Sequence, residues 1–287
     1  MVTVILVSSS KLMLILTAIA IAAATYTVTN AFVVLPDGRK VRVIKNDVLV
    51  DAIGNYIVER VEQLANEAIA SKGAFSMSIG SGTTVQPLKL LADRAIDFSK
   101  VHIFFGNERT EGVTAGKCFN SGTEVFDTLV GLPASNVHRV PELPAEEAAI
   151  FYETVLRDMP HDIVGICDST GLPSFDLCLL GSGADGHCAS LYPDSSQVVC
   201  SPGLRDRIYL PVEGKGGITL SIDTINSARN VLISAGKASQ SDMCRKCLGW
   251  SNADTNHMLP AGMISANEGA AVEWILSEQS AADLPAM

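Results

Sequence analysis

The sequence predicts an α/β fold: a single domain with a mainly parallel, modified Rossmann-like sheet flanked by helices. Two observations support this fold class. Short apolar segments of strand length alternate along the chain with longer segments whose apolar residues recur at helical spacing. In addition, no linker-like low-complexity segment and no internal repeat divides the 287 residues. Strands that alternate with helices are typical of a parallel sheet that helices cover on both faces.

The predicted strands are short apolar or alternating segments between turn residues. They are Lys40–Ile44, Phe75–Ile79, Val101–Phe105, Phe175–Leu180, Val231–Ala235 and a pair near Arg207–Leu210 and Ile218–Ser221. The predicted helices carry apolar residues at helical spacing, as Ile53, Ile57 and Val61 do in the first of them. They are a helix that Asp47 or Asp51 caps and that runs to Ser71, then Val85–Ala95, Ser121–Val130, Ala145–Met159, Ser239–Leu248 and Ala266–Ser277.

The composition is that of an ordinary globular protein and argues against nucleic-acid binding. Hydrophobic residues make up 47% of the chain and charged residues 18%, which excludes a disordered protein. A formal net charge of −10 argues against nucleic-acid binding, because that function needs a basic face. An anionic substrate must therefore be held by local basic side chains and backbone N–H groups.

The seven cysteines are scattered and odd in number, which is a poor disulfide framework. Cys244 and Cys247 form a lone CxxC motif without a second pair or a histidine at ligand spacing. We expect these two thiols to lie on one helix as structural residues, and we expect neither a metal nor a cofactor.

Residues 1–31 predict a signal peptide or targeting leader, and residues 32–287 the α/β domain. Leu12–Ala24 is strongly apolar, Lys11 precedes it, and small residues precede Phe32. The apolar segment is shorter than the about 20 residues of a membrane span, although a retained anchor is the alternative, and only then would the membrane be a partner. The leader predicts targeting through the secretory route, with a plastid as one destination, and leaves a cytoplasmic location open.

The strongest chemical signal follows the predicted strand Phe175–Leu180. Glycines at 181 and 183 lead into Asp185 and His187, where the carboxyl end of a strand places ligand-binding loops. Histidine titrates near neutral pH, so it can take a proton from water and return it in one turnover. A loop that merely caps its own histidine is the alternative interpretation.

Two other strand ends carry polar residues. Gly80, Ser81, Gly82, Thr83 and Thr84 follow one strand and open a helix, a position that favours phosphate, although a structural tight turn has the same sequence. Gly106–Arg109 follows another strand. In one interpretation, Arg109 lies beside the same crevice at the strand ends as Asp185 and His187. In the other, it forms a solvent-exposed ion pair with Glu108.

Several segments match the motifs of one enzyme family in order and spacing. They are Gly80–Thr84 with Pro87-Leu88, Gly106–Arg109, Gly131–Pro141, Gly181–Pro193, Ile218–Leu220, Asn226–Arg229, Gly236–Ala238 and Leu259–Ala261. From about Val41 to Leu276 the chain therefore resembles the glucosamine-6-phosphate isomerase/6-phosphogluconolactonase family. The segment Ala189–Pro193 resembles the lactonase branch rather than the deaminase branch, which has a phenylalanine–asparagine–glutamate run after its histidine.

The resemblance implies an enzyme of the oxidative pentose phosphate pathway that hydrolyses 6-phospho-D-glucono-1,5-lactone to 6-phosphogluconate without a cofactor. It implies that His187 is the general base for water and that Asp185 orients its imidazole. The phosphate or the developing oxyanion would be held by Gly80, Ser81, Gly82, Thr83, Thr84, Arg109 and Lys237.

Three departures from the family pattern concern substrate binding. Asn107 replaces an aspartate, Gly217 replaces an arginine for which Lys215 is a candidate substitute, and the order of small residues in Gly80–Thr84 is shuffled. Two alternatives stay open, and the missing charges at Asn107 and Gly217 favour the first of them. One is a non-catalytic sugar-phosphate binding protein, and the other is an amino-sugar phosphate deaminase on the same scaffold.

Overall fold

The computed structural model describes residues 32–45, 51–198, 206–212, 214–249, 258–265 and 271–285. The predicted leader, residues 1–31, lies outside the described residues, so the division into leader and domain stays a prediction. Among the described residues, no helix is both long and apolar enough to span a membrane.

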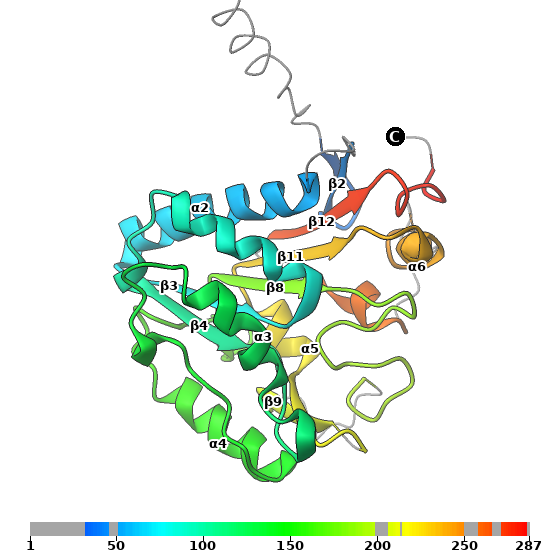
Figure 1. Ribbon diagram of the computed structural model, residues 1–287. Helices are drawn as coiled ribbons and strands as arrows, with labels where there is room; N and C mark the ends of the chain where they lie inside the picture. Colours follow the sequence, from blue (N-terminus) through cyan, green and yellow to red (C-terminus); the bar gives the residue numbers. More distant parts are fainter. Residues whose placement is uncertain are drawn as a thin grey trace, which may run out of the picture. The chain divides into compact units, whose positions relative to one another are not determined.

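A seven-stranded sheet forms the centre of the fold, in the order β1-β2-β12-β11-β8-β3-β4 (Figure 1). Its strands are β1 (Val33–Val34), β2 (Lys40–Ile44), β12 (Ala271–Ser277), β11 (Asn230–Ala235), β8 (Leu177–Gly181), β3 (Phe75–Ile79) and β4 (Val101–Phe105). Only β1 and β2 pair antiparallel; the other neighbours are parallel. This topology, with flanking helices, confirms the predicted α/β fold with a mainly parallel sheet.

The principal helices pack beside these strands. They are α2 (Ala52–Lys72), α3 (Lys117–Phe126), α4 (Ala145–Arg157), α5 (Ile222–Asn226) and α6 (Ser241–Cys247). Asp51 begins α2, because its Oδ1 accepts the backbone N–H of Gly54 at 2.9 Å. Gly73 ends this helix at a φ of 90°, which glycine adopts without strain. In Figure 1, α2 runs beside β12 and β11, and α4 lies beside β9 (Tyr209–Val212).

Two smaller sheets and several 3₁₀ helices complete the architecture. One sheet has the order β5-β10-β9 (Asn107–Arg109, Gly217–Leu220, Tyr209–Val212), and the other pairs β6 (Gly165–Ile166) with β7 (Pro173–Ser174). The 3₁₀ segments are η1 (Gly82–Thr84), η2 (Gln86–Asp93), η3 (Phe98–Lys100), η4 (Gly112–Thr114), η5 (Ala134–Asn136), η7 (Ala238–Gln240) and η8 (Pro260–Met263).

The helix predicted at Ala266–Ser277 is wrong, because Ala271–Ser277 is the strand β12. The remaining residues of that prediction, 266–270, lie outside the described part of the chain. β12 lies between β2 and β11, and each residue from Val272 to Ser277 is buried. A strand buried on both faces is apolar without alternation, so its periodicity does not distinguish it from a buried helix.

Other predicted boundaries shift by a few residues. The segment predicted as the helix Val85–Ala95 is the 3₁₀ helix η2, with a proline in its first turn. The helix predicted at Ser121–Val130 begins earlier and is α3. The strand predicted at Arg207–Leu210 is β9, two residues further along the chain. Such shifts are ordinary, because local patterns define element ends poorly.

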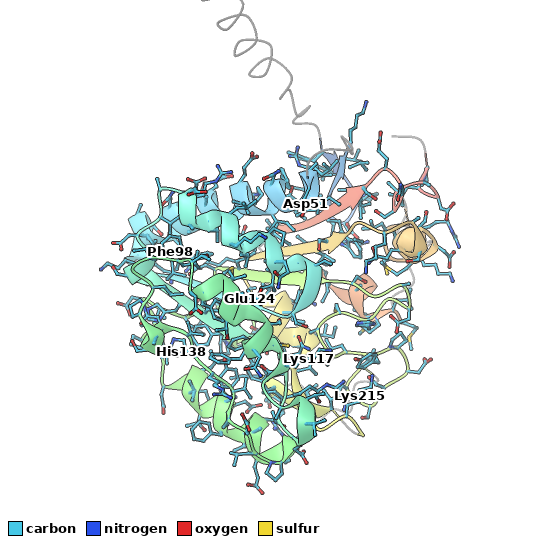
Figure 2. The ribbon with its side chains drawn as sticks, viewed as in Figure 1. Asp51, Phe98, Lys117, Glu124, His138 and Lys215 are labelled. Carbon is cyan, nitrogen blue, oxygen red and sulfur yellow. The ribbon has the colours of Figure 1, made fainter. Side chains whose placement is uncertain are left out.

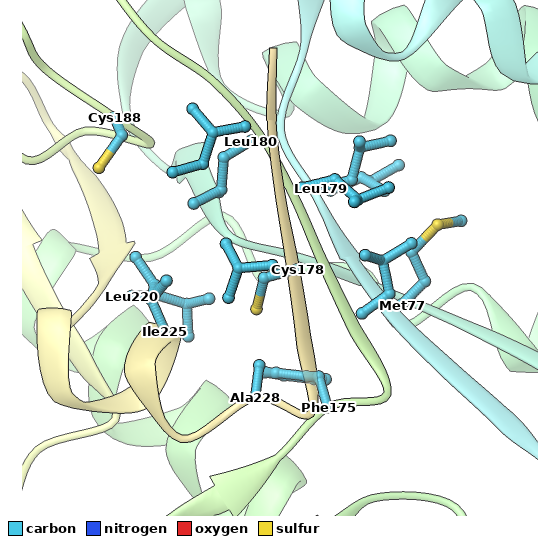
Figure 3. Packing of buried hydrophobic residues seen from close by; sticks show 14 of the residues in the cluster. Met77, Phe175, Cys178, Leu179, Leu180, Cys188, Leu220, Ile225 and Ala228 are labelled. Carbon is cyan, nitrogen blue, oxygen red and sulfur yellow. The ribbon is translucent and has the colours of Figure 1, made fainter. Parts of the chain in front are cut away.

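The core packs against both faces of β8, whose residues Leu177–Leu180 are at most 2% exposed. Figure 3 shows Leu179 directed towards Met77 on one side of this strand, and Cys178 towards Leu220 and Ile225 on the other. Because successive side chains of a strand point to opposite faces, the continuous apolar segment serves two core layers at once. This packing holds the loop after β8 in place.

Cys244 and Cys247 lie together on α6 and are buried, which confirms the prediction that the two thiols share one helix. Burial raises the pKa of each to about 12. Among the described residues, no group of three or more histidine, cysteine, aspartate or glutamate side chains is arranged to hold a metal ion.

One buried charge network crosses from α2 to the sheet. Glu273 of β12 is 5% exposed and accepts hydrogen bonds from the Tyr56 hydroxyl, from Arg42 Nε at 3.3 Å and from Arg60 Nε at 3.2 Å. Burial and the bond to Glu273 raise the pKa of Tyr56. The carboxylate thus pairs with two guanidinium groups in a largely dry environment.

Candidate active site

Two adjoining cavities lie where β3, β8 and β11 end. The first, of about 330 Å³, is called the Lys237 cavity; it is lined by Asp51, Ile53, Gly54, Thr83, Thr84, Gly181, Ser182, Ser234, Gly236, Lys237 and Gln240. The second, of about 200 Å³, is called the His187 cavity; it is lined by Gly80, Ser81, Thr83, Thr84, Asn107, Leu179, Leu180, Gly181, Ser182, His187 and Ala189. Four shared residues at 83, 84, 181 and 182 make them parts of one crevice.

The register of the sheet explains this location. Gly181 at the end of β8 lies opposite Ser234 of β11, and Ile79 at the end of β3 lies opposite Leu179. The loops that follow these strands therefore emerge together at the carboxyl-terminal edge of the sheet, where the parallel strands end, at the right of Figure 1. Ligands of parallel α/β sheets bind at this edge.

His187 and Asp185 form a hydrogen-bonded pair at the His187 cavity. Asp185 Oδ1 lies 2.6 Å from His187 Nδ1 and 3.2 Å from the His187 backbone nitrogen. Partial burial raises the pKa of Asp185, but the hydrogen bonds from His187 outweigh burial and lower it. An ionised Asp185 that accepts the Nδ1 proton leaves the lone pair of Nε2 as the basic site of the ring.

Gly183 is required for this pair to form. A Cβ at position 183 would lie 2.2 Å from His187 Nδ1 and 2.4 Å from Asp185 Oδ1. Gly186, at a φ of 86°, turns the loop between the two side chains, and its N–H donates to the Gly183 carbonyl at 3.0 Å. The Asp185–His187 contact therefore occupies the space that a side chain at 183 would need.

We expect Gly183→Ala to separate Asp185 from His187 and to lower kcat by up to about 10²-fold, the effect of a 1 Å misplacement of a reacting group. Gly165→Ala is the matched control, because a Cβ there meets only ordinary contacts of 3.6 Å or more. The measurement is turnover of the proposed substrate by the two variants at equal folded concentration. Wild-type turnover by Gly183→Ala would show that the pair is dispensable.

The His187 ring also contacts an aromatic side chain that a lysine covers. The Tyr192 ring lies 4.9 Å from the His187 ring, centroid to centroid, and Lys215 Nζ lies 3.2 Å from the centre of the Tyr192 ring. Arg109 Nη1 donates to the carbonyl of Lys215. Arg109 is not among the residues that line the two cavities; it lies with Lys215 (labelled in Figure 2) at the turn before β10.

The predicted phosphate loop and Lys237 do come together. Thr83 and Thr84 line both cavities, and Lys237 lines the larger one. Gly82 adopts a φ of 84° and begins η1. Thr84 Oγ1 lies 3.0 Å from Ser234 Oγ, so a hydroxyl pair ties this loop to the end of β11.

Asn107 and Glu108 have separate roles. Asn107 lines the His187 cavity, and its Nδ2 donates to Ser190 Oγ at 3.0 Å, which supports the loop that follows His187. Glu108 is 3% exposed and accepts the backbone N–H groups of Cys118 at 2.7 Å and Phe119 at 2.8 Å. The interpretation of Glu108 and Arg109 as a solvent-exposed pair is therefore wrong, because Glu108 holds the first turn of α3.

The structure also leaves no space for a side chain at position 217. Gly217 of β10 lies opposite Arg109, and a Cβ there would be 2.4 Å from the Glu108 carbonyl oxygen. An arginine at this position would require β5 and β10 to separate. Lys215 is the cationic side chain that this turn directs towards Tyr192.

The remaining described histidines lie away from the crevice. His102 Nδ1 and His138 Nε2 are 3.1 Å apart at β4, and the His138 ring (labelled in Figure 2) stacks on Phe104 at 4.2 Å. Burial and the neighbouring His102 lower the pKa of His138 to about 4. His161 is exposed, and His257 lies outside the described residues. The described ones fit the expected structural or exposed roles.

Sequence reasoning missed Asp51, Ser182, Ser234 and Gln240 as lining residues of the crevice. Each is a polar residue near an element end; Ser182 lies within the matched segment Gly181–Pro193, but its own residue type gave no signal of a lining role. The pairing of β8 with β11 would have identified Ser182 and Ser234. Ser182 follows Gly181, the last residue of β8, and Ser234 of β11 lies opposite Gly181.

A sequence model of the family described as "Glucosamine-6-phosphate isomerases/6-phosphogluconolactonase" matches residues 48–274. The chain belongs to this family. The match covers the β3, β4, β8 and β11 strand ends that build the crevice and includes both residues of the Asp185–His187 pair.

Several curated relatives come from plants. The chain is 29% identical over 227 residues to a protein of Oryza sativa subsp. indica named probable 6-phosphogluconolactonase 3, chloroplastic, covering 76% of this chain and 68% of the relative. It is also 29% identical over 234 residues to 6-phosphogluconolactonase 3, chloroplastic, of Arabidopsis thaliana, covering 77% and 69%. A probable 6-phosphogluconolactonase 1 of Oryza sativa subsp. japonica is 27% identical over 245 residues, covering 82% of each.

Solved structures share the fold. The 6-phosphogluconolactonase of Thermotoga maritima superposes with a TM-score of 0.64 at 22% identity, covering 83% of this chain and 100% of that one. The Trypanosoma cruzi 6-phosphogluconolactonase has a TM-score of 0.68 at 18% identity, covering 87% and 98%. Chains only 22% and 18% identical to this one thus share its fold.

Proposed function

We propose that this protein hydrolyses 6-phospho-D-glucono-1,5-lactone to 6-phosphogluconate in the oxidative pentose phosphate pathway. The observation that carries the proposal is the position of the Asp185–His187 pair in one crevice with the Gly80–Thr84 loop and Lys237. The names of the curated relatives support the same reaction. Lactone hydrolysis needs a base for water, donors for an oxyanion and an anchor for the phosphate, and this crevice offers candidates for each.

His187 is the proposed general base. Its Nε2 removes a proton from water while the water oxygen forms a bond to C1 of the lactone, and the carbonyl oxygen becomes an oxyanion. The tetrahedral intermediate then collapses: the bond between C1 and the ring oxygen breaks, and Nε2 returns the proton to that oxygen. The product is an open-chain acid, which ionises in water. Asp185 holds the ring and stabilises its protonated form.

The proposed anchor for the phosphate is the Lys237 cavity, because it combines a lysine with the hydroxyls of Thr83 and Thr84. The carbonyl group then lies in the adjoining His187 cavity, where Ser81, Asn107 and the Gly80–Thr84 loop are the candidate donors for the oxyanion. Arg109 and Lys215 lie beyond the cavity walls at the β9–β10 turn. From there they raise the local positive potential for an anionic substrate in a chain of net charge −10.

The test is turnover of the lactone by the purified protein. The lactone is generated from glucose 6-phosphate with a dehydrogenase, and 6-phosphogluconate formation is compared with the spontaneous rate, since this lactone also opens unaided. Formation clearly above that rate is expected. Ammonia release from glucosamine 6-phosphate would instead identify a deaminase, and calorimetric binding of 6-phosphogluconate without turnover would identify a binding protein.

The compartment we propose is a plastid, reached through the leader predicted in residues 1–31. Two of the compared relatives carry the word chloroplastic in their names. A fluorescent fusion of residues 1–45 tests this proposal, and a diffuse cytoplasmic signal would overturn it.

A further inference from the structure

One buried side chain connects the two halves of the crevice. Gln240, the last residue of η7, is 7% exposed and lines the Lys237 cavity. Its Oε1 accepts the backbone N–H of Lys237 at 2.7 Å, and its Nε2 donates to the Ser182 carbonyl at 2.6 Å. Both ends of the carboxamide are therefore used, one by the residue that opens η7 and the other by the residue that follows β8.

Ser182 is the first residue of the loop that carries His187. It pairs with Cys188 across this loop, and its Oγ donates to the His187 carbonyl at 3.2 Å. The Gln240 amide therefore bonds the turn that bears Lys237 to the loop that bears His187. A backbone hydrogen bond from the Ser182 N–H to the Ser234 carbonyl also joins this loop to β11. At 3.3 Å it is longer than the 2.6 Å bond from Gln240 to Ser182.

We propose that Gln240 is a positioning residue that sets the separation of Lys237 from His187. The inference rests on the proposed function: the phosphate and the reacting carbonyl of the substrate are joined covalently, so an anchor and a base that act on them must keep a matching separation. A misplacement of about 1 Å can cost about 10²-fold in rate. A carboxamide suits this role because it carries a donor and an acceptor at a constant spacing and no charge.

The test compares Gln240→Leu with the wild type and then repeats the substitution in a Lys237→Ala background. Leucine retains volume but loses both hydrogen bonds. We expect kcat/KM for the lactone to fall about 10- to 100-fold and the Kd for 6-phosphogluconate to rise. In the Lys237→Ala background we expect Gln240→Leu to change kcat/KM and Kd little further, because the anchor whose position Gln240 sets has been removed.

Gln63→Leu is the matched control. Gln63 lies on the exposed face of α2, and its amide is also bonded at both ends, to Arg60 Nη1 at 2.5 Å and to Glu67 Oε1 at 2.8 Å. This variant is expected to bind and turn over substrate like the wild type.

Two results would overturn the proposal: unchanged kinetics and Kd in Gln240→Leu, or the same fold loss in both backgrounds, which is the mark of a purely structural role. If the wild type fails to hydrolyse the lactone, the proposed function fails. The comparison of 6-phosphogluconate Kd values across the four proteins of the cycle then still decides whether Gln240 positions Lys237.

Discussion

His187→Gln is expected to lower kcat for the lactone by about 10²–10⁴-fold, the usual contribution of a positioned general base. Glutamine is similar in length and can still donate to Asp185, but it cannot take a proton from water. Because the substitution leaves Lys237 and the Gly80–Thr84 loop in place, KM should change little. Steady-state rates with the spontaneous opening subtracted measure both constants.

His161→Gln is the control for this experiment, since His161 is an exposed histidine outside the two cavities. It should keep the wild-type rate. An enzyme-dependent rate in His187→Gln equal to the wild type would show that another group activates the water, and the assignment of the base would be abandoned.

Glu273→Ala should lower the free energy of unfolding by about 3–5 kcal/mol, the cost of removing one partner from a buried ion pair. The substitution removes the carboxylate to which Arg42 Nε and Arg60 Nε both donate, and the Arg42 guanidinium lies 4.6 Å from the centre of the Tyr56 ring. It also leaves a cavity in β12, the strand between β2 and β11. Urea or guanidinium unfolding, followed by circular dichroism, measures the change.

Glu67→Ala is the corresponding control on the exposed face of α2, where the carboxylate accepts a hydrogen bond from Gln63 at 2.8 Å. Surface substitutions of this kind usually change stability by within about 0.5 kcal/mol. If Glu273→Ala lowers the free energy of unfolding by less than about 1 kcal/mol, the desolvation penalty of burying these charges offsets their attraction, and the prediction is wrong.

Most of the sheet was predictable because its strands have local signals. Phe75–Ile79, Val101–Phe105 and Lys40–Ile44 are strands with the predicted bounds. β12 was predicted as a helix because a segment apolar on all sides satisfies either structure, and only its place between two strands decides. Glu273 adds to the difficulty, since a lone carboxylate in such a segment reads as an exposed helical face until its partners on β2 and α2 are known.

The candidate site divides in the same way. The proposed site residues that stand in consecutive motifs, such as Asp185 with His187 or the Gly80–Thr84 loop, could be proposed from the sequence, because each motif combines glycine with polar or titratable groups at a strand end. Glu108 was misinterpreted because its partners, the N–H groups at the start of α3, are brought to it only by folding. Nothing near Gln240 in the sequence indicates that its amide reaches Ser182, 58 residues away.

By itself, then, the sequence determined the fold class, the family resemblance and the local motifs, all of which depend on residues close together in the chain. The tertiary structure decided which strand ends are neighbours, and so which motifs share a crevice. It also decided that the Arg109 guanidinium, at the end of β5, bonds to the β9–β10 turn rather than lining a cavity wall, and that position 217 has no room for a side chain. The physical reason is that strand pairing joins residues far apart in sequence, and hydrogen bonds across those pairs have no local signature.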